Sequence, residues 1–233
     1  MSSPRLQTST SATFKSPPLD GSLFLPELCD WHGKHSPTHE LFVYAKEDGV
    51  VESIKWSEAS RSIRRGAQMI RERIGQDASE GTVVAILSPS GASWSLTCWY
   101  KHTSHRVHIA DSIPYATTIL SIMRANCVAF PISTRNSAAA VAHLINQTGV
   151  SHILVGHEQA MQDLVERSLE ALRTQHGDTP RVTLSLMPTF EELYSDEGLN
   201  TAVDIPWKPQ GPDTPSLILH SSGKVHSGNG APY

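Results

Sequence analysis

Short apolar runs and helical periodicity alternate along most of this chain. The runs are five or six residues long, which is typical of buried strands in a parallel sheet, and the first of them begins with β-branched side chains. They predict strands at residues 82–87, 127–132, 150–155, 182–186 and 216–220. A further pair, 42–45 and 50–56, flanks the turn Glu47–Asp48–Gly49 and predicts a β-hairpin.

Between the strands, apolar residues recur every three or four positions and predict helices. Ser57 is the expected N-cap of the first one, which Gly75 ends, and Pro114 lies near the start of a second. Ser137 and Gly149 delimit a third, and a fourth precedes 182–186. Strands that alternate with helices predict an α/β fold, layered α/β/α with a mostly parallel sheet.

The composition narrows the functional classes. The 233 residues are 39% hydrophobic and 18% charged with a net charge of −4, which excludes a wholly disordered chain and argues against nucleic-acid binding. No apolar run approaches the roughly 20 residues of a membrane span. Three widely spaced cysteines suggest a reducing compartment, so a cytoplasmic location and no cysteine-based metal site are expected.

Three segments depart from the regular pattern. Residues 1–20 are rich in Ser and Thr and are expected to form a disordered leader, and 224–233 reads as a loop. Residues 91–110 contain two Trp and three His but no acid, and they stand where a strand-to-helix loop normally takes about 2–6 residues. This atypical insertion is a surface loop, a metal-binding or lid loop, or a translated intron; sequencing the transcript discriminates the last.

Two groups of histidines are candidate metal ligands. His102, His105 and His108 lie in the insertion, and His32, His35 and His39 precede the hairpin. Neither group has a zinc-site spacing, so a surface insertion and a solvated amphipathic turn are the favoured interpretations, and no metal ligand is assigned.

The charged side chains favour solvent-exposed faces. Arginines of the first periodic helix lie opposite its isoleucines, and Glu191–Glu192 and Asp196–Glu197 are acidic pairs. The arginines are Arg61, Arg64, Arg65, Arg71 and Arg73. The sequence has no Gly-x-Ser-x-Gly motif, which a serine hydrolase would need. It also has no Walker A motif, since Val225 stands where the Ser or Thr after Gly223–Lys224 would be needed.

Three blocks resemble the N-terminal part of adenylate-forming enzymes, the AMP-binding synthetase and ligase family. Residues 54–59 (IKWSEA) are similar to the family's first core motif, and 121–132 (SIMRANCVAFPI) to its second. Residues 216–223 (SLILHSSG) resemble the strand that leads into its Ser/Thr/Gly-rich phosphate loop. Fungal non-ribosomal-peptide-synthetase-like carboxylate reductases of the aminoadipate type are the most similar group. The resemblance covers residues 21–223 apart from the insertion.

This resemblance implies ATP and magnesium as cofactors, a carboxylic acid as substrate and a phosphopantetheine carrier as partner. It assigns Ser221, Ser222 and Gly223 to the phosphate loop, because small residues let backbone N–H groups approach phosphate oxygens. After Gly223 the sequence leaves the family pattern. The expectation is therefore a truncated, inactive adenylation domain without assigned catalytic residues. The alternative is a non-enzymatic nucleotide-binding or protein-interaction module.

Overall fold

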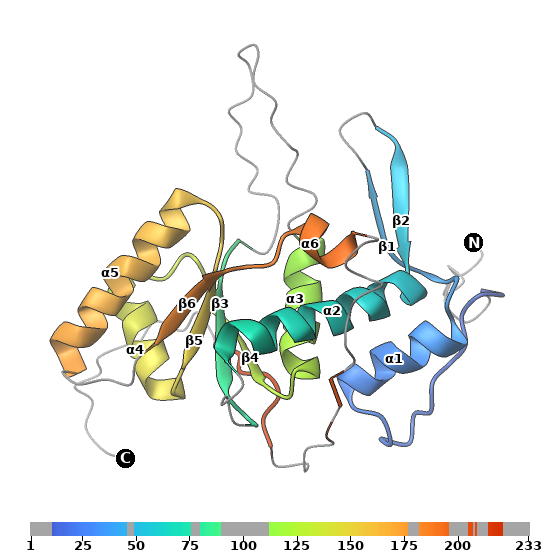
Figure 1. Ribbon diagram of the computed structural model, residues 1–233, viewed down its shortest axis with the longest axis horizontal. Coiled ribbons are helices and arrows are strands. Elements are labelled where there is room, and N and C mark those ends of the chain that lie inside the picture. The colour runs from blue at the N-terminus through green and yellow to red at the C-terminus, as the bar shows by residue number, and fades with distance from the viewer. Residues whose placement is uncertain are drawn as a thin grey trace, which may run out of the picture.

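A computed structural model describes residues 11–45, 49–75, 80–89, 112–176, 182–195, 205–206, 208 and 214–220. Within these residues, the main sheet has four parallel strands. They are β3 (Val83–Leu87), β4 (Val128–Pro131), β5 (His152–Val155) and β6 (Thr183–Leu186), in the order β4-β3-β5-β6. The next strand along the chain, β4, therefore lies on one side of β3, and β5 and β6 lie on the other side (Figure 1). The predicted parallel sheet is confirmed.

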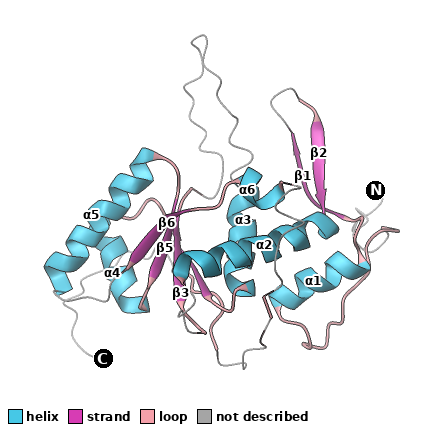
Figure 2. Cartoon of the chain, viewed as in Figure 1, coloured by secondary structure: helices cyan, strands magenta, loops and turns pink. Residues whose placement is uncertain are grey.

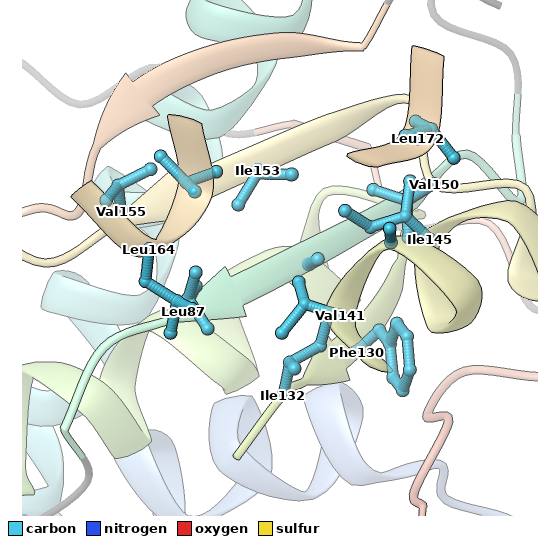
Figure 3. Close-up of a cluster of buried hydrophobic side chains, with 13 residues drawn as sticks. Leu87, Phe130, Ile132, Val141, Ile145, Val150, Ile153, Val155, Leu164 and Leu172 are labelled. Atoms are coloured by element: carbon cyan, nitrogen blue, oxygen red, sulfur yellow. The ribbon is translucent and has the colours of Figure 1, made fainter. Parts of the chain in front are cut away.

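Helices cover both faces of this sheet, as Figure 2 shows. They are α2 (Trp56–Ile74) and α3 (Ser112–Arg124) on one face, and α4 (Ala138–Thr148) and α5 (Gln159–His176) on the other. Successive side chains of a strand point to opposite faces. Accordingly, Val84 and Ile86 of β3 pack with α2 and α3, whereas Ala85 and Leu87 pack with α4 and α5 (Figure 3). The α/β/α prediction is confirmed.

The two helices on the α2 face approach each other closely at a glycine. A Cβ atom on Gly66 would lie 2.2 Å from Ser121 Oγ and 2.8 Å from Ser121 Cβ. Ser121 is itself buried, and its hydroxyl donates to the carbonyl of Thr117 one turn earlier at 2.7 Å. Only a residue without a side chain leaves room for this crossing, and this explains a glycine inside α2 despite its low helix propensity.

The N-terminal part adds a helix and a hairpin beside α2. The hairpin consists of β1 (Glu40–Ala45) and β2 (Val51–Lys55), antiparallel as predicted. The expected N-cap Ser57 is wrong, since α2 begins at Trp56 and its N-cap is Lys55, two residues earlier. The N–H groups of Trp56 and Ser57 donate to His39 and Pro37, and Glu58 accepts the N–H of Lys55 at 2.8 Å. The link to α1 therefore sets where the helix starts.

A helix, α1 (Leu25–His35), occupies the region expected to be a solvated turn. His32 is 4% exposed and stacks on Trp56 with ring centroids 4.6 Å apart. Phe14, from the expected leader, stacks on the His32 ring with centroids 5.2 Å apart and meets the His39 ring in a tilted contact at 5.1 Å. The histidines here thus build an aromatic cluster. Residues 1–10 of the leader lie outside the described part.

The predicted strand 216–220 is reduced to a single bridge. Leu217 pairs in parallel with Ala129 at the outer edge of β4, and pairing stops there. The cause is Pro131, the last residue of β4, which has no N–H to donate across that edge. The segment 214–220 therefore accompanies β4 without becoming a fifth full strand.

The prediction that the α2 arginines and Glu191–Glu192 are solvent-exposed holds for Arg61 and Glu191, whereas Arg65 and Arg73 are only partly exposed and contact other elements. Arg73 Nη1 donates to the carbonyl of Leu186 at 2.7 Å, and Arg65 donates to the carbonyl of Glu192. The Glu192 carboxylate accepts the N–H of Thr189 at 2.8 Å, which begins the short helix α6 (Phe190–Tyr194). These side chains hold α6 against α2; Asp196–Glu197 lies outside the described residues.

A buried histidine links β5 to β6. His152 is 2% exposed, and its Nδ1 and Nε2 lie 2.7 and 2.8 Å from the hydroxyls of Thr183 and Ser185. Burial, reinforced by the charge of Arg73, lowers the pKa of His152 to about 4. Protonation would place an uncompensated charge inside the sheet.

We expect the free energy of unfolding to fall by about 3 kcal/mol on this account as the pH drops from 6.5 to about 4, because the unfolded histidine takes up a proton that the folded one resists. The contribution is fully present above pH 6.5. Urea unfolding of the wild type and of His152→Gln at pH 7 and pH 4.5 measures it. The variant keeps a hydrogen-bonding side chain without titrating, so parallel pH dependences in the two proteins would refute the assignment.

Candidate functional site

The carboxyl ends of the parallel strands meet at one edge of the sheet, where ligands of open α/β folds bind. Here β3 leads into Ser88, β4 into Ser133 and β5 into Gly156. The connection from β3 runs to one side of the sheet and that from β5 to the other, so the switch point lies between Ser88 and Gly156. This edge is the candidate site.

At the switch point the segments that follow β3 and β5 are in close contact. The N–H of Gly156 donates to the carbonyl of Leu87 at 3.0 Å. A Cβ on Gly156 would lie 2.9 Å from Ser88 Oγ and 2.5 Å from a carboxylate oxygen of Glu158. The glycine thus leaves space in which a buried hydroxyl and an exposed carboxylate converge. Such a pair offers polar contacts to a ligand, but its geometry does not favour one class of ligand over another.

Before it reaches this edge, the returning chain is held at the opposite, amino end of β4 by the turn between α3 and β4. Arg124 is 4% exposed, and its Nη1 donates to the carbonyl of Ile205 at 2.6 Å. Asn126, in the left-handed conformation at φ 59°, donates to the carbonyl of Pro206 and accepts the N–H of Lys208, both at 3.2 Å. These contacts bring the chain to the outer side of β4, where residues 214–220 follow.

The charge of Arg124 is balanced from α1. Its Nε lies 3.4 Å from Asp30 Oδ2, an ionic contact too long for a good hydrogen bond, while Arg64 Nε donates to Asp30 Oδ1 at 2.9 Å. One carboxylate therefore serves two guanidinium groups from α2 and α3. Water can solvate the charge of Arg64, whose side chain is 39% exposed, so the carboxylate matters more for the buried Arg124.

His220 ends the described part of the returning segment. Its Nε2 accepts the backbone N–H of Ser133 at 3.0 Å, and its ring meets Phe130 edge-on with centroids 6.1 Å apart. His220 directly precedes the predicted phosphate-loop residues. Ser221, Ser222 and Gly223 themselves lie outside the described residues, so their assignment stays a prediction.

The histidine groups give no metal site in the described part. His35 Nδ1 contacts the carbonyl of Trp31 at 2.9 Å, and His39 Nδ1 contacts Thr13 Oγ1 at 3.0 Å. Across the described ranges, no group of three or more His, Cys, Asp or Glu side chains could hold a metal ion. His102, His105 and His108 fall in the undescribed segment 90–111, as does the whole predicted insertion 91–110.

Sequence reasoning missed the roles of His220, Ser133 and Arg124. His220 stood inside the 216–223 block, but its partner lies 87 positions earlier in the chain. The one available signal was Pro131, whose missing N–H at the end of a predicted strand indicates an edge where backbone pairing stops. Arg124 gave no such signal, because a basic residue in the last turn of a helix is common.

A family model of AMP-binding enzymes matches residues 106–223, about half of the chain. The chain belongs to the AMP-binding enzyme family. The match includes the second and third blocks of the predicted resemblance and ends at Gly223. The resemblance to adenylate-forming enzymes is therefore confirmed.

Curated relatives agree with this membership. The chain is 36% identical over 230 residues to adenylate-forming reductase Nps10 of Heterobasidion annosum, covering 95% of this chain and 19% of the relative. Two further adenylate-forming reductases match, and the chain spans less than a fifth of the length of each.

Two solved structures share the fold. A fatty acyl CoA synthetase of Mycobacterium tuberculosis superposes with a TM-score of 0.55 over 84% of this chain and 32% of the synthetase, at 18% identity. The AMPPNP-bound form of the nonribosomal peptide synthetase FmoA3 gives a TM-score of 0.52 over 89% of this chain and 17% of the synthetase, also at 18% identity. Within the described residues of our chain, no helix is both long and apolar enough to cross a membrane.

Replacement of Asp30 by Asn should lower the free energy of unfolding by about 2–3 kcal/mol, because it removes a carboxylate that faces the buried guanidinium of Arg124. The amide of Lys208, held by the same turn, should exchange faster. Arg64→Gln is the matched control, expected to cost under about 1 kcal/mol since Arg64 is partly exposed. Urea unfolding and hydrogen exchange measure both, and an equal loss in the two variants would contradict this account.

Proposed function

We propose that this chain supplies part of the site of an adenylate-forming reductase, an enzyme that uses ATP to activate a carboxylic acid. The observation that carries the proposal is the family match from 106 to 223, whose last block runs along β4 to the carboxyl edge of the sheet. The curated relatives are named adenylate-forming reductases.

In the proposed reaction, a carboxylate oxygen of the substrate attacks the α-phosphorus of ATP. The bond to the β-phosphate oxygen breaks, so pyrophosphate leaves and an acyl-adenylate remains. The backbone N–H groups of Ser221, Ser222 and Gly223 would hold phosphate oxygens, and magnesium would balance their charge. The acyl group would then pass to the thiol of a phosphopantetheine carrier, with AMP as the leaving group.

The described residues fit only part of this role. The proline break in β4 and the His220 contact lie at the sheet edge directly before the predicted loop, which supports a backbone phosphate cradle at this position. The buried thiols do not suit nucleophilic catalysis, since burial raises the pKa of Cys29 to about 12 and raises that of Cys127 as well. We therefore propose that the 233 residues contribute to nucleotide binding and do not complete the reaction by themselves.

ATP–pyrophosphate exchange tests this proposal. The chain, given ATP, magnesium and a panel of carboxylic acids, should show no exchange above background. When it replaces the aligned segment of the Heterobasidion annosum relative, exchange should persist, and Gly223→Val in that hybrid should abolish it by closing the phosphate cradle. Robust turnover by the chain itself, or a folded but inert hybrid, would contradict the proposal.

A second candidate is a non-enzymatic interaction module, favoured by apolar side chains at the edge of the sheet. Leu184 and Leu186 of β6 are 43% and 46% exposed, although their neighbours Ile153 and Val155 on β5 are buried. Light scattering on the purified chain discriminates the candidates. A stable monomer would favour a self-contained module, whereas aggregation would favour a part of a larger enzyme that normally covers this edge.

A further inference from the structure

The outer edge of β4 presents the N–H groups of alternate residues to the returning segment. Residues 128, 130 and 132 direct their N–H groups to β3, which leaves 129, 131 and 133 for the other side. At the first of these positions a regular parallel ladder begins. The N–H of Ala129 donates to Ser216 at 3.0 Å, and Ile218 donates to Ala129 at 2.9 Å.

Pro131 interrupts this ladder because it has no N–H. In a regular continuation, residue 131 would donate to the carbonyl of residue 218, and residue 133 to the carbonyl of residue 220. The first of these bonds cannot form. The N–H of Ser133 is instead taken up by the imidazole Nε2 of His220 at 3.0 Å. A side chain thus replaces the main-chain acceptor at the last position of the edge.

This replacement has two physical consequences. The ring must be neutral and protonated on Nδ1, because Nε2 can accept a hydrogen bond only when it carries no proton. The carbonyl of His220 is also spared from the ladder with Ser133, so its backbone can turn away from β4 while the side chain keeps it attached. The edge-on contact with the buried Phe130 fixes the ring plane.

We propose that His220 is a positioning residue of the nucleotide site: its side chain holds residue 220, which directly precedes the predicted phosphate loop, to Ser133, while Pro131 ends the backbone pairing of 216–220 with β4. This inference rests on the proposed function for its ligand, a nucleoside triphosphate, and on the described contacts for its geometry. Backbone N–H groups that are not engaged in a sheet are the donors that phosphate oxygens require.

The experiment uses the 233-residue chain, with two variants that separate the acceptor from the ring. His220→Phe keeps an aromatic ring against Phe130 but removes the acceptor, whereas His220→Gln keeps an acceptor near the Nε2 position. Hydrogen exchange of the Ser133 amide should accelerate about fivefold in His220→Phe, the factor that one hydrogen bond of about 1 kcal/mol provides, and should be restored in His220→Gln.

The nitrogen-15 spectrum of the wild-type histidine should show a proton on Nδ1 and none on Nε2. Magnesium-ATP added at millimolar concentration should shift the resonances of Ser133 and His220, and His220→Phe should need at least fivefold more ATP for the same shift.

The experiment tests the His220–Ser133 contact and its link to nucleotide binding separately. Unchanged Ser133 exchange in His220→Phe, or a proton on Nε2, would overturn the positioning role whatever ATP does. A protected Ser133 amide with no response to ATP in the wild type would leave the contact intact and overturn its link to nucleotide binding, and with it the proposed function. Loss of ATP response in both variants would show that the acceptor is not what matters, which also overturns the inference.

Discussion

The buried charge of Arg124 is the constraint on which the arrangement of both ends of the chain depends. A guanidinium that is 4% exposed must find a carboxylate and hydrogen-bond acceptors, because an uncompensated charge is costly away from water. Asp30 supplies the charge from α1, and the carbonyl of Ile205 supplies an acceptor from the returning chain. The same side chain therefore connects the N-terminal helix, the end of α3 and the segment that leads to the candidate site.

The sheet carries the second constraint, which is where backbone pairing is allowed to stop. The central strands are satisfied by their neighbours on both sides, and their side chains are buried under helices on both faces. At the edge of β4, Pro131 makes further pairing impossible and leaves the last N–H to the imidazole of His220. A site that needs free backbone donors is compatible with such an edge, whereas a complete fifth strand would consume them.

Much of the fold followed from local patterns. The apolar runs located β3, β4 and β5 because a strand buried on both faces has no polar alternation to obscure it. The run 182–186 also located β6, although its leucines are partly exposed. Ser137 caps α4 by accepting the N–H of Ala140, and Gly149 ends it at φ 65°, both as predicted from residue type. The start of α2 and the existence of α1 were not predicted, because hydrogen bonds from Trp56 and Ser57 to distant carbonyls, and the burial of His32 among aromatic rings, decide them.

By itself, the sequence determined the layered α/β architecture, the order of the parallel strands and of the helices between them, and the resemblance to adenylate-forming enzymes. These are encoded in the spacing of apolar residues and in short contiguous motifs, which local physics and residue identity suffice to interpret. Only the tertiary structure decided that arginines of α2 are engaged, that His152 links two strands, and that His220 meets Ser133. Each of these contacts joins residues about 30 to more than 100 positions apart, and only the packing of helices on the sheet brings such partners within hydrogen-bonding distance.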